Sequence, residues 1–200
     1  MTNRRDVIKG GMAASAILGT RPVLAAGQSA KPQVPPANRF HAVLFDRRYA
    51  DSIAFGEAAR RMGQTTHAIS GDVTAYWYEH LDPLWRKGPV AIAGLTEPGP
   101  LFVLERLAWE KGLRVAVKAE HKLDSSHVVH EIHGLADTPS DLPSKGWAPV
   151  MAALIGDCPL DGVETSCRLV GSGKATVRMP EDGLITWVIA PIARTGFPRT

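Results

Sequence analysis

Four short apolar runs alternate with segments of helical periodicity between residues 41 and 117, and this alternation constrains the fold more than any other feature. The predicted strands are 41–45, 65–69, 90–93 and 113–117. The predicted helices between them are 49–62, 73–85 and 100–111. Strands separated by helices predict βαβ units with right-handed crossovers. We therefore expect an α/β fold with a mostly parallel sheet and flanking helices, Rossmann-like or flavodoxin-like.

The pattern changes from about residue 122, where glycine, proline and polar turns become frequent. Strand-like runs follow at 128–132, 167–170, 175–179 and 185–189, and a short helix is predicted over 147–156. The last two runs are predicted to pair as a hairpin through the turn at 180–183. We expect a single α/β domain over residues 40–200, ending in a small antiparallel β-rich extension from about residue 122.

The N-terminus carries paired arginines, Arg4 and Arg5, followed by two aliphatic residues and Lys9. A weakly apolar run comes next, and it is too short for a stable membrane span. Small residues near Ala25 then offer a cleavage site for a signal peptidase. Residues 1–25 resemble a twin-arginine export signal. The resemblance implies recognition by the twin-arginine export machinery and a periplasmic location. Passengers of that pathway cross the membrane folded, often with a cofactor, so the identity of any cofactor stays open. Residues 26–39 are predicted to form a proline-rich linker.

The charge balance argues against nucleic acid as a partner. The chain has 23 basic and 20 acidic residues, but the predicted signal holds four of the basic residues and one of the acidic ones. The remaining chain therefore has 19 of each and is formally neutral. The basic isoelectric point belongs to the targeting peptide, and no basic stripe with interleaved aromatics indicates a nucleic-acid surface.

Polar residues collect where the predicted parallel strands end. In open α/β sheets the carboxyl ends of the strands border the ligand crevice. The residues at these ends are Asp46, Arg47, Arg48, Ser70, Gly71, Asp72, Thr96, Gly99, Glu120 and His121. A purely structural interpretation is open for each, because Asp72 and Thr96 suit helix N-caps and the glycines suit tight turns.

The sequence is compatible with three functions, and the first two of them use this edge. The first is binding of a small polar or anionic ligand by Arg47, Arg48, Ser70, Gly71, Thr96 and Gly99. The second is catalysis, with His121 as general base and Asp46 or Asp72 as its acid or orienting group. The third is an accessory subunit of an exported redox enzyme, which predicts an exposed apolar patch near Trp147 or residues 191–197.

The histidines around residue 130 do not have the spacing of a known zinc motif. On a strand, Glu131 and His133 share one face while His130 points to the other. No metal site is predicted. The weak candidates are Glu131 with His133, or an imidazole such as His67 joined by distant residues.

Cys158 and Cys167 are the two cysteines of the chain. In an oxidising compartment, their nine-residue separation across a turn-like segment predicts one disulfide. No Gly-x-Ser-x-Gly elbow, phosphate loop or dinucleotide-binding glycine pattern is present. These absences disfavour an ordinary α/β-hydrolase and the usual modes of nucleotide binding.

Overall fold

The computed structural model of the protein describes residues 39–137, 139–158, 160, 165–175 and 179–191. All of them belong to one compact unit, Val34–Thr200. The predicted signal, 1–25, and all of the predicted linker except Arg39 lie outside the described residues. None of the described helices is long and apolar enough to cross a lipid bilayer.

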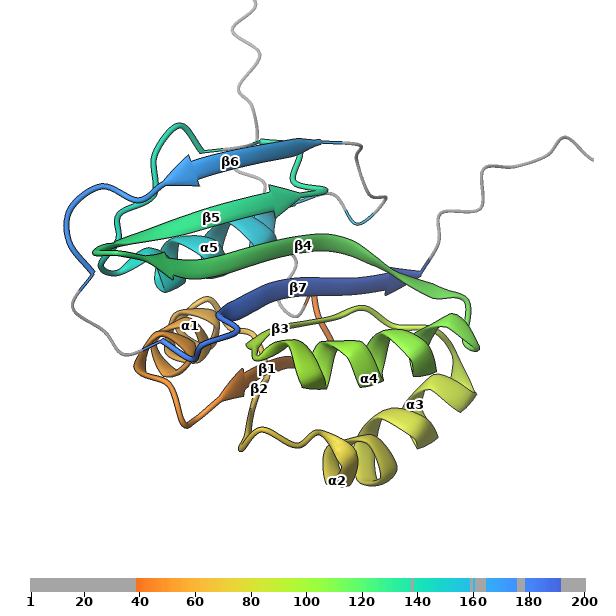
Figure 1. The fold of residues 1–200 in the computed structure, drawn as a ribbon. Coiled ribbons are helices and arrows are strands. Elements are labelled where there is room, and N and C mark those ends of the chain that lie inside the picture. Colours follow the sequence, from red (N-terminus) through yellow and green to blue (C-terminus); the bar gives the residue numbers. More distant parts are fainter. Residues whose placement is uncertain (1–38, 138, 159, 161–164, 176–178, 192–200) are drawn as a thin grey trace, which may run out of the picture. The chain divides into compact units, whose positions relative to one another are not determined.

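The described strands form one seven-stranded sheet with the order β2-β1-β3-β7-β4-β5-β6 (Figure 1). The strands are β1 (Val43–Asp46), β2 (Thr66–Ile69), β3 (Ile92–Thr96), β4 (Leu113–Asp124), β5 (His127–His133), β6 (Ser166–Val170) and β7 (Leu184–Pro191). The helices are α1 (Ala50–Arg61), α2 (Thr74–Tyr76), the π-helix η1 (Trp77–Leu81), α3 (Asp82–Lys87), α4 (Pro98–Trp109) and α5 (Trp147–Asp157). The α/β class is confirmed.

The expectation of a mostly parallel sheet is wrong. Only β1 with β2 and β1 with β3 pair in parallel, whereas the other four pairs are antiparallel. Strands β1 to β4 do run in the same direction, because β4 and β3 are both antiparallel to β7. β4 is nevertheless separated from β3 by β7, so the sheet is not the continuous parallel sheet that a Rossmann-like fold requires.

Strand β7 occupies the centre of the sheet because its sequence suits burial on both faces. Seven of its eight residues are buried, Leu184 to Ala190. Both of its edges are taken by β3 and β4, so the predicted hairpin with residues 175–179 is wrong. Of that partner run, residues 176–178 lie outside the described residues.

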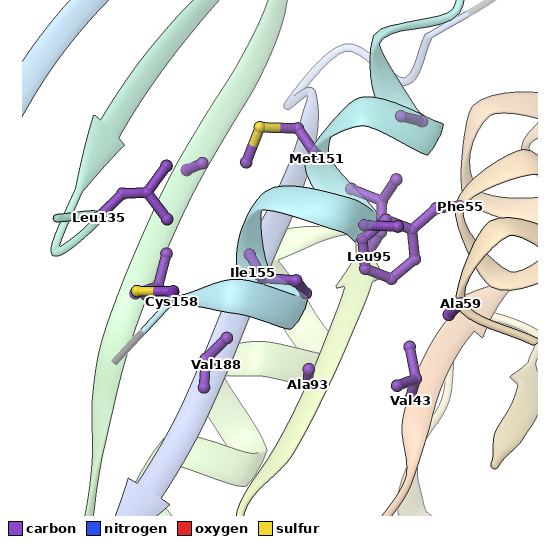
Figure 2. Packing of buried hydrophobic residues seen from close by; sticks show 14 of the residues in the cluster. Val43, Phe55, Ala59, Ala93, Leu95, Leu135, Met151, Ile155, Cys158 and Val188 are labelled. Carbon is purple, nitrogen blue, oxygen red and sulfur yellow. The ribbon is translucent and has the colours of Figure 1, made fainter. Parts of the chain in front are cut away.

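Two apolar clusters cover the two faces of the sheet. One contains side chains of α1 and α5, and the other contains side chains of α2, η1, α3 and α4. In Figure 1, α5 passes behind β4 and β5, whereas α4 lies in front of the sheet. Figure 2 shows Met151 and Ile155 of α5 over Val188 and Ala93, with Phe55 of α1 to one side. The outer face of β4, β5 and β6 instead carries charged side chains such as Lys118, Glu120 and Arg168.

Candidate functional site

The carboxyl ends of β1, β2 and β3 meet at one edge of the sheet. Asp46 and Ile69, the last residues of β1 and β2, are paired directly, and β3 pairs along the other side of β1. Arg48 follows β1, and its guanidinium contacts Asp46 and Glu97 and lies against Gly71. The residues that follow three of the four predicted strands therefore lie close together here, and the Arg48 side chain contacts all three groups.

Arg48 is held on this edge by two carboxylates. Its Nε donates to Asp46 Oδ1 at 2.9 Å, and its Nη2 donates to Asp46 Oδ2 at 2.6 Å and also to Glu97 Oε2. Asp46 is fully buried, whereas the Arg48 side chain is 39% exposed. Its Nη1 makes no hydrogen bond to any residue that the structure describes. The guanidinium is thus fixed in place with one nitrogen uncommitted.

Tyr49 completes the arrangement through Glu97. Its hydroxyl donates to Glu97 Oε1 at 2.6 Å, and burial, reinforced by that bond, raises the pKa of Tyr49 to about 12. The phenol therefore stays a hydrogen-bond donor at neutral pH. The charge of Arg48 is offset by Asp46 and Glu97, so this edge does not carry the net positive potential that the arginine pair alone predicts.

Gly71 has a role here beyond that of a turn residue. Its φ is +80°, in the region that favours glycine. A Cβ at this position would lie 2.6 Å from Arg48 Cζ, well inside contact distance. The glycine therefore allows the guanidinium to lie directly against the backbone that follows β2.

The other predicted edge residues fall into two groups. Thr96 is buried and structural, since its Oγ1 accepts from Trp187 Nε1 at 3.1 Å and donates to the Glu97 carbonyl at 2.8 Å. Asp72 accepts from the Thr74 backbone N–H at 2.8 Å ahead of α2, and its hydrogen bonds with Thr74 lower the pKa of Asp72. The remaining predicted residues, Arg47, Ser70 and Gly99, are exposed.

Ser52 supports the edge and was not predicted. Its Oγ accepts from the Asp46 N–H at 2.7 Å and donates to the Leu95 carbonyl at 2.5 Å. This hydroxyl ties the first turn of α1 to the ends of β1 and β3. A lone serine early in a helix carries no sequence signal for such a bridge.

The proposed catalytic residues His121, Asp46 and Asp72 do not come together. His121 is fully buried, and its ring lies 4.0 Å from that of Trp147, centre to centre, on the face that α5 covers. Asp46 follows Leu44 by two residues, so it faces the opposite side of the sheet. Trp147 is also fully buried, so an exposed apolar patch cannot be centred on it, and the other predicted place for the patch, 191–197, lies outside the described residues except for Pro191.

His121 forms a buried pair with His130, whose orientation away from Glu131 is confirmed. The two Nδ1 atoms lie 2.7 Å apart, and His121 Nε2 lies 2.9 Å from Thr186 Oγ1. One Nδ1 must donate and the other accept. If His130 donates, His121 donates in turn to Thr186 and His130 Nε2 keeps a lone pair. If His121 donates, His130 Nε2 becomes a buried N–H.

The His130 Nε2 atom has no hydrogen-bond partner within the described structure. Burying an unpartnered lone pair costs less free energy than burying an unpartnered N–H, so the arrangement in which His130 Nδ1 donates to His121 is favoured. Burial, with a smaller contribution from His130, holds the pKa of His121 well below its usual value. Burial also lowers the pKa of His130 to about 4. Both imidazoles are therefore neutral at pH 7.

Asp51, in the first turn of α1, brings a third titratable group to this interior. It is only 7% exposed, and burial raises its pKa, partly offset by the indole N–H of Trp147. That N–H does not reach hydrogen-bond geometry with any described residue. The sequence gives no sign of this cluster, because α5 and α1 are brought together only by the tertiary fold.

The weak metal candidates Glu131 and His133 lie on the outer face of the antiparallel strands. Glu131 is opposite Glu120 and is 3.6 Å from Arg168 Nε, while His133 is opposite Lys118. Among the described residues, no three His, Cys, Asp or Glu side chains gather as ligands for one ion.

No disulfide joins Cys158 and Cys167 in the described structure. Cys158 follows α5, and its Sγ donates to the Gly134 carbonyl at 3.7 Å. Cys167, on β6, packs against the same apolar cluster. The predicted disulfide therefore stays a prediction.

A hollow lies at the opposite edge of the sheet. It has a volume of about 520 Å³ and is bordered by Phe40, His41, Thr65, Ala91 and Pro191, among others. Arg39, the one charged group among the described residues that line it, is already bound to the carbonyls of Gly156 and Cys158. Few oriented polar groups line this hollow. The edge of the sheet around Arg48, at the carboxyl ends of β1, β2 and β3, is therefore the better candidate site, and we call it the Arg48 edge.

Comparison of the chain with protein-family models, curated proteins and solved structures found no match in any of the three.

Proposed function

We propose that the protein is exported through the twin-arginine pathway to the periplasm. There it binds a small polar ligand at the carboxyl ends of β1, β2 and β3. One observation carries the binding proposal: Arg48 is clamped by Asp46 and Glu97, lies against Gly71, and keeps Nη1 uncommitted. A donor fixed by its neighbours loses little conformational entropy when a ligand arrives.

The charges around Arg48 indicate the kind of ligand. Asp46 and Glu97 already balance its charge, and Asp72 is close by along the chain after Gly71. A polyanion would meet these carboxylates, whereas a neutral or singly charged ligand would not be strongly repelled. We therefore favour a small molecule with a carbonyl, hydroxyl or single carboxylate oxygen, held by Arg48 Nη1 and the exposed Arg47.

Catalysis by His121 with Asp46 or Asp72 receives no support from these distances and orientations. His121 is sealed beneath Trp147 and bonded to His130 and Thr186, so no solvent-borne substrate has direct access to its nitrogens. Binding thus accounts for the edge without requiring His121 to move.

The test compares native and denaturing mass spectra of the protein recovered from the periplasm. We expect a mass excess in the native spectrum that is lost on denaturation. Arg48→Lys keeps the positive charge but removes the bidentate guanidinium, so it should reduce the fraction of protein that carries the ligand. Arg86→Lys is the matched control, because Arg86 also pairs with a carboxylate, Asp82, but its side chain is 70% exposed and lies away from the Arg48 edge. Equal occupancy in wild type and Arg48→Lys would reject the proposed site.

An accessory subunit of an exported redox enzyme is a second candidate, supported by exposed apolar residues on α4. Phe102 and Trp109 are 59% and 47% exposed, and Arg106 lies over both rings. A photo-crosslinker at Phe102 should then capture one exported redox enzyme, and a crosslinker at the equally exposed Val170 should not. The same products from both positions would argue against this candidate.

A further inference from the structure

Three aromatic rings lie close together, one each from the edge strand β2, from α2 and from the π-helix η1. The ring centres of His67 and Tyr76 are 4.1 Å apart, those of Tyr76 and His80 are 4.9 Å apart, and those of His67 and His80 are 5.6 Å apart. Neither histidine belongs to the Arg48 edge or to the buried histidine pair. The proximity of two imidazoles near the surface is unexplained by the proposed function.

The fold brings these rings together across a gap of twelve residues. His67 is paired with Leu44 in β1 and so faces the side of the sheet that α2 and η1 cover. The widened turn of η1 presents His80 beside Tyr76. π-Turns of this kind are rare and occur frequently at functional sites.

The separation of the two imidazoles suits a shared metal ion. With zinc–nitrogen bonds of about 2.0–2.1 Å, each ring centre lies roughly 3.2 Å from the ion, and two rings at a tetrahedral angle have centres roughly 5.3 Å apart. The observed 5.6 Å, with the rings at 61°, is close to that value. The buried pair differs, because its Nδ1 atoms are already hydrogen-bonded at 2.7 Å.

The exposure of His80 and the negative charge of Glu79 also suit the binding of a cation. The His80 side chain is 50% exposed, which gives a hydrated ion access. Glu79 Oε2 lies 3.9 Å from His80 Nε2, too far for a hydrogen bond but near enough to interact with a bound ion or its water.

We propose that His67 and His80 form a binding site for a divalent transition-metal ion, with water completing its coordination and Glu79 supplying negative charge. Imidazole ligands suit copper and zinc, and Cu²⁺ should bind more tightly than Zn²⁺. Since no three candidate ligands gather within the described chain, two protein ligands imply an exchangeable ion. This site is independent of ligand binding at Arg48.

The test is a calorimetric titration of the untagged exported protein with Cu²⁺ and, separately, Zn²⁺. We expect saturable binding, with Cu²⁺ tighter, and at least a tenfold loss of Cu²⁺ affinity in both His67→Asn and His80→Asn. His127→Asn and His133→Asn are matched controls on another surface and should bind as wild type does. Circular dichroism should give the same spectrum for all four variants.

Unchanged Cu²⁺ affinity in the His67→Asn/His80→Asn double variant would overturn the proposal, because any ion bound would then sit elsewhere, such as on the chain's amino terminus. An absence of saturable binding by the wild type would overturn it as well. Neither outcome bears on the mass measurement that tests the Arg48 site.

Discussion

Individual residues at the Arg48 edge were partly predictable. Asp46, Arg48 and Gly71 all follow predicted strands, and parallel strands place such residues at one edge. The sequence could not indicate that the Arg48 guanidinium would be hydrogen-bonded to Asp46 and Glu97, because these bonds depend on side-chain geometry across β1 and β3. The sequence pattern places His121 at the end of a strand, but β4 extends to Asp124, so His121 lies within the strand and faces the interior.

The buried pair His121–His130 predicts that acid destabilises the fold. Both pKa values are below the ordinary 6.5, so the folded state binds fewer protons than the unfolded state. The contribution of this pair to stability is therefore fully present above pH 6.5 and is lost as the pH drops toward 4. For His130 alone the loss is on the order of 3 kcal/mol. Urea unfolding between pH 7.5 and 4.5, followed by tryptophan fluorescence, measures it.

The variant His130→Leu should flatten this dependence, because it removes one of the two buried bases. The exposed His133→Ala is the control and should keep the wild-type slope. A free energy of unfolding that does not change between pH 6.5 and 4.5 in the wild type would contradict the assignment.

At the scale of elements, most helices and strands were predictable and their order in the sheet was not. The helix at 49–62 and the four alternating strands follow from apolar periodicity, which is a local property. The position of β7 depends on contacts with β3 and β4, about 90 and 70 residues away along the chain. The predicted helix over 73–85 continues to Lys87, because Pro83 sits at the start of α3 after the widened turn η1.

The close approach of β3 and β7 makes Gly94 intolerant of a side chain. A Cβ there would lie 2.5 Å from Trp187 Cζ2 and 2.8 Å from the Leu44 carbonyl oxygen. Gly94→Ala should lower the free energy of unfolding by about 1–3 kcal/mol. Gly156→Ala in α5 is the control, since nothing lies within 4 Å of its Cβ and alanine favours helix. Equal stability of the two variants in urea would show that β3 and β7 do not pack in this way.

Cys158 and Cys167 should become joined in the exported protein. Cys158 belongs to the apolar cluster beneath α5 and Cys167 packs against the same cluster, so both side chains lie on the same face of the sheet. The disulfide should add roughly 2–3 kcal/mol of stability. Intact mass after alkylation without reductant measures it: two blocked cysteines support the bond, and two alkylated cysteines refute it.

At the scale of the whole molecule, the proposed function depends on export through the twin-arginine pathway. Conservative replacement of Arg4 and Arg5 by lysine keeps the charge of the N-terminus, yet it should abolish recognition by the twin-arginine machinery. We expect the double variant to stay in the cytoplasm as uncleaved precursor, which fractionation and immunoblotting would detect. Periplasmic recovery at the wild-type level would instead point to a general secretory signal.

Ligand binding at the Arg48 edge is best tested by hydrogen exchange of the protein as recovered from the periplasm, compared with the same protein after unfolding and refolding in clean buffer. Loss of the ligand should speed amide exchange at 46–49, 70–72 and 97–99, the three segments around Arg48. Unchanged exchange there, or a change confined to Phe40, His41 and Ala91 at the opposite edge, would contradict a ligand site at the carboxyl ends of β1, β2 and β3.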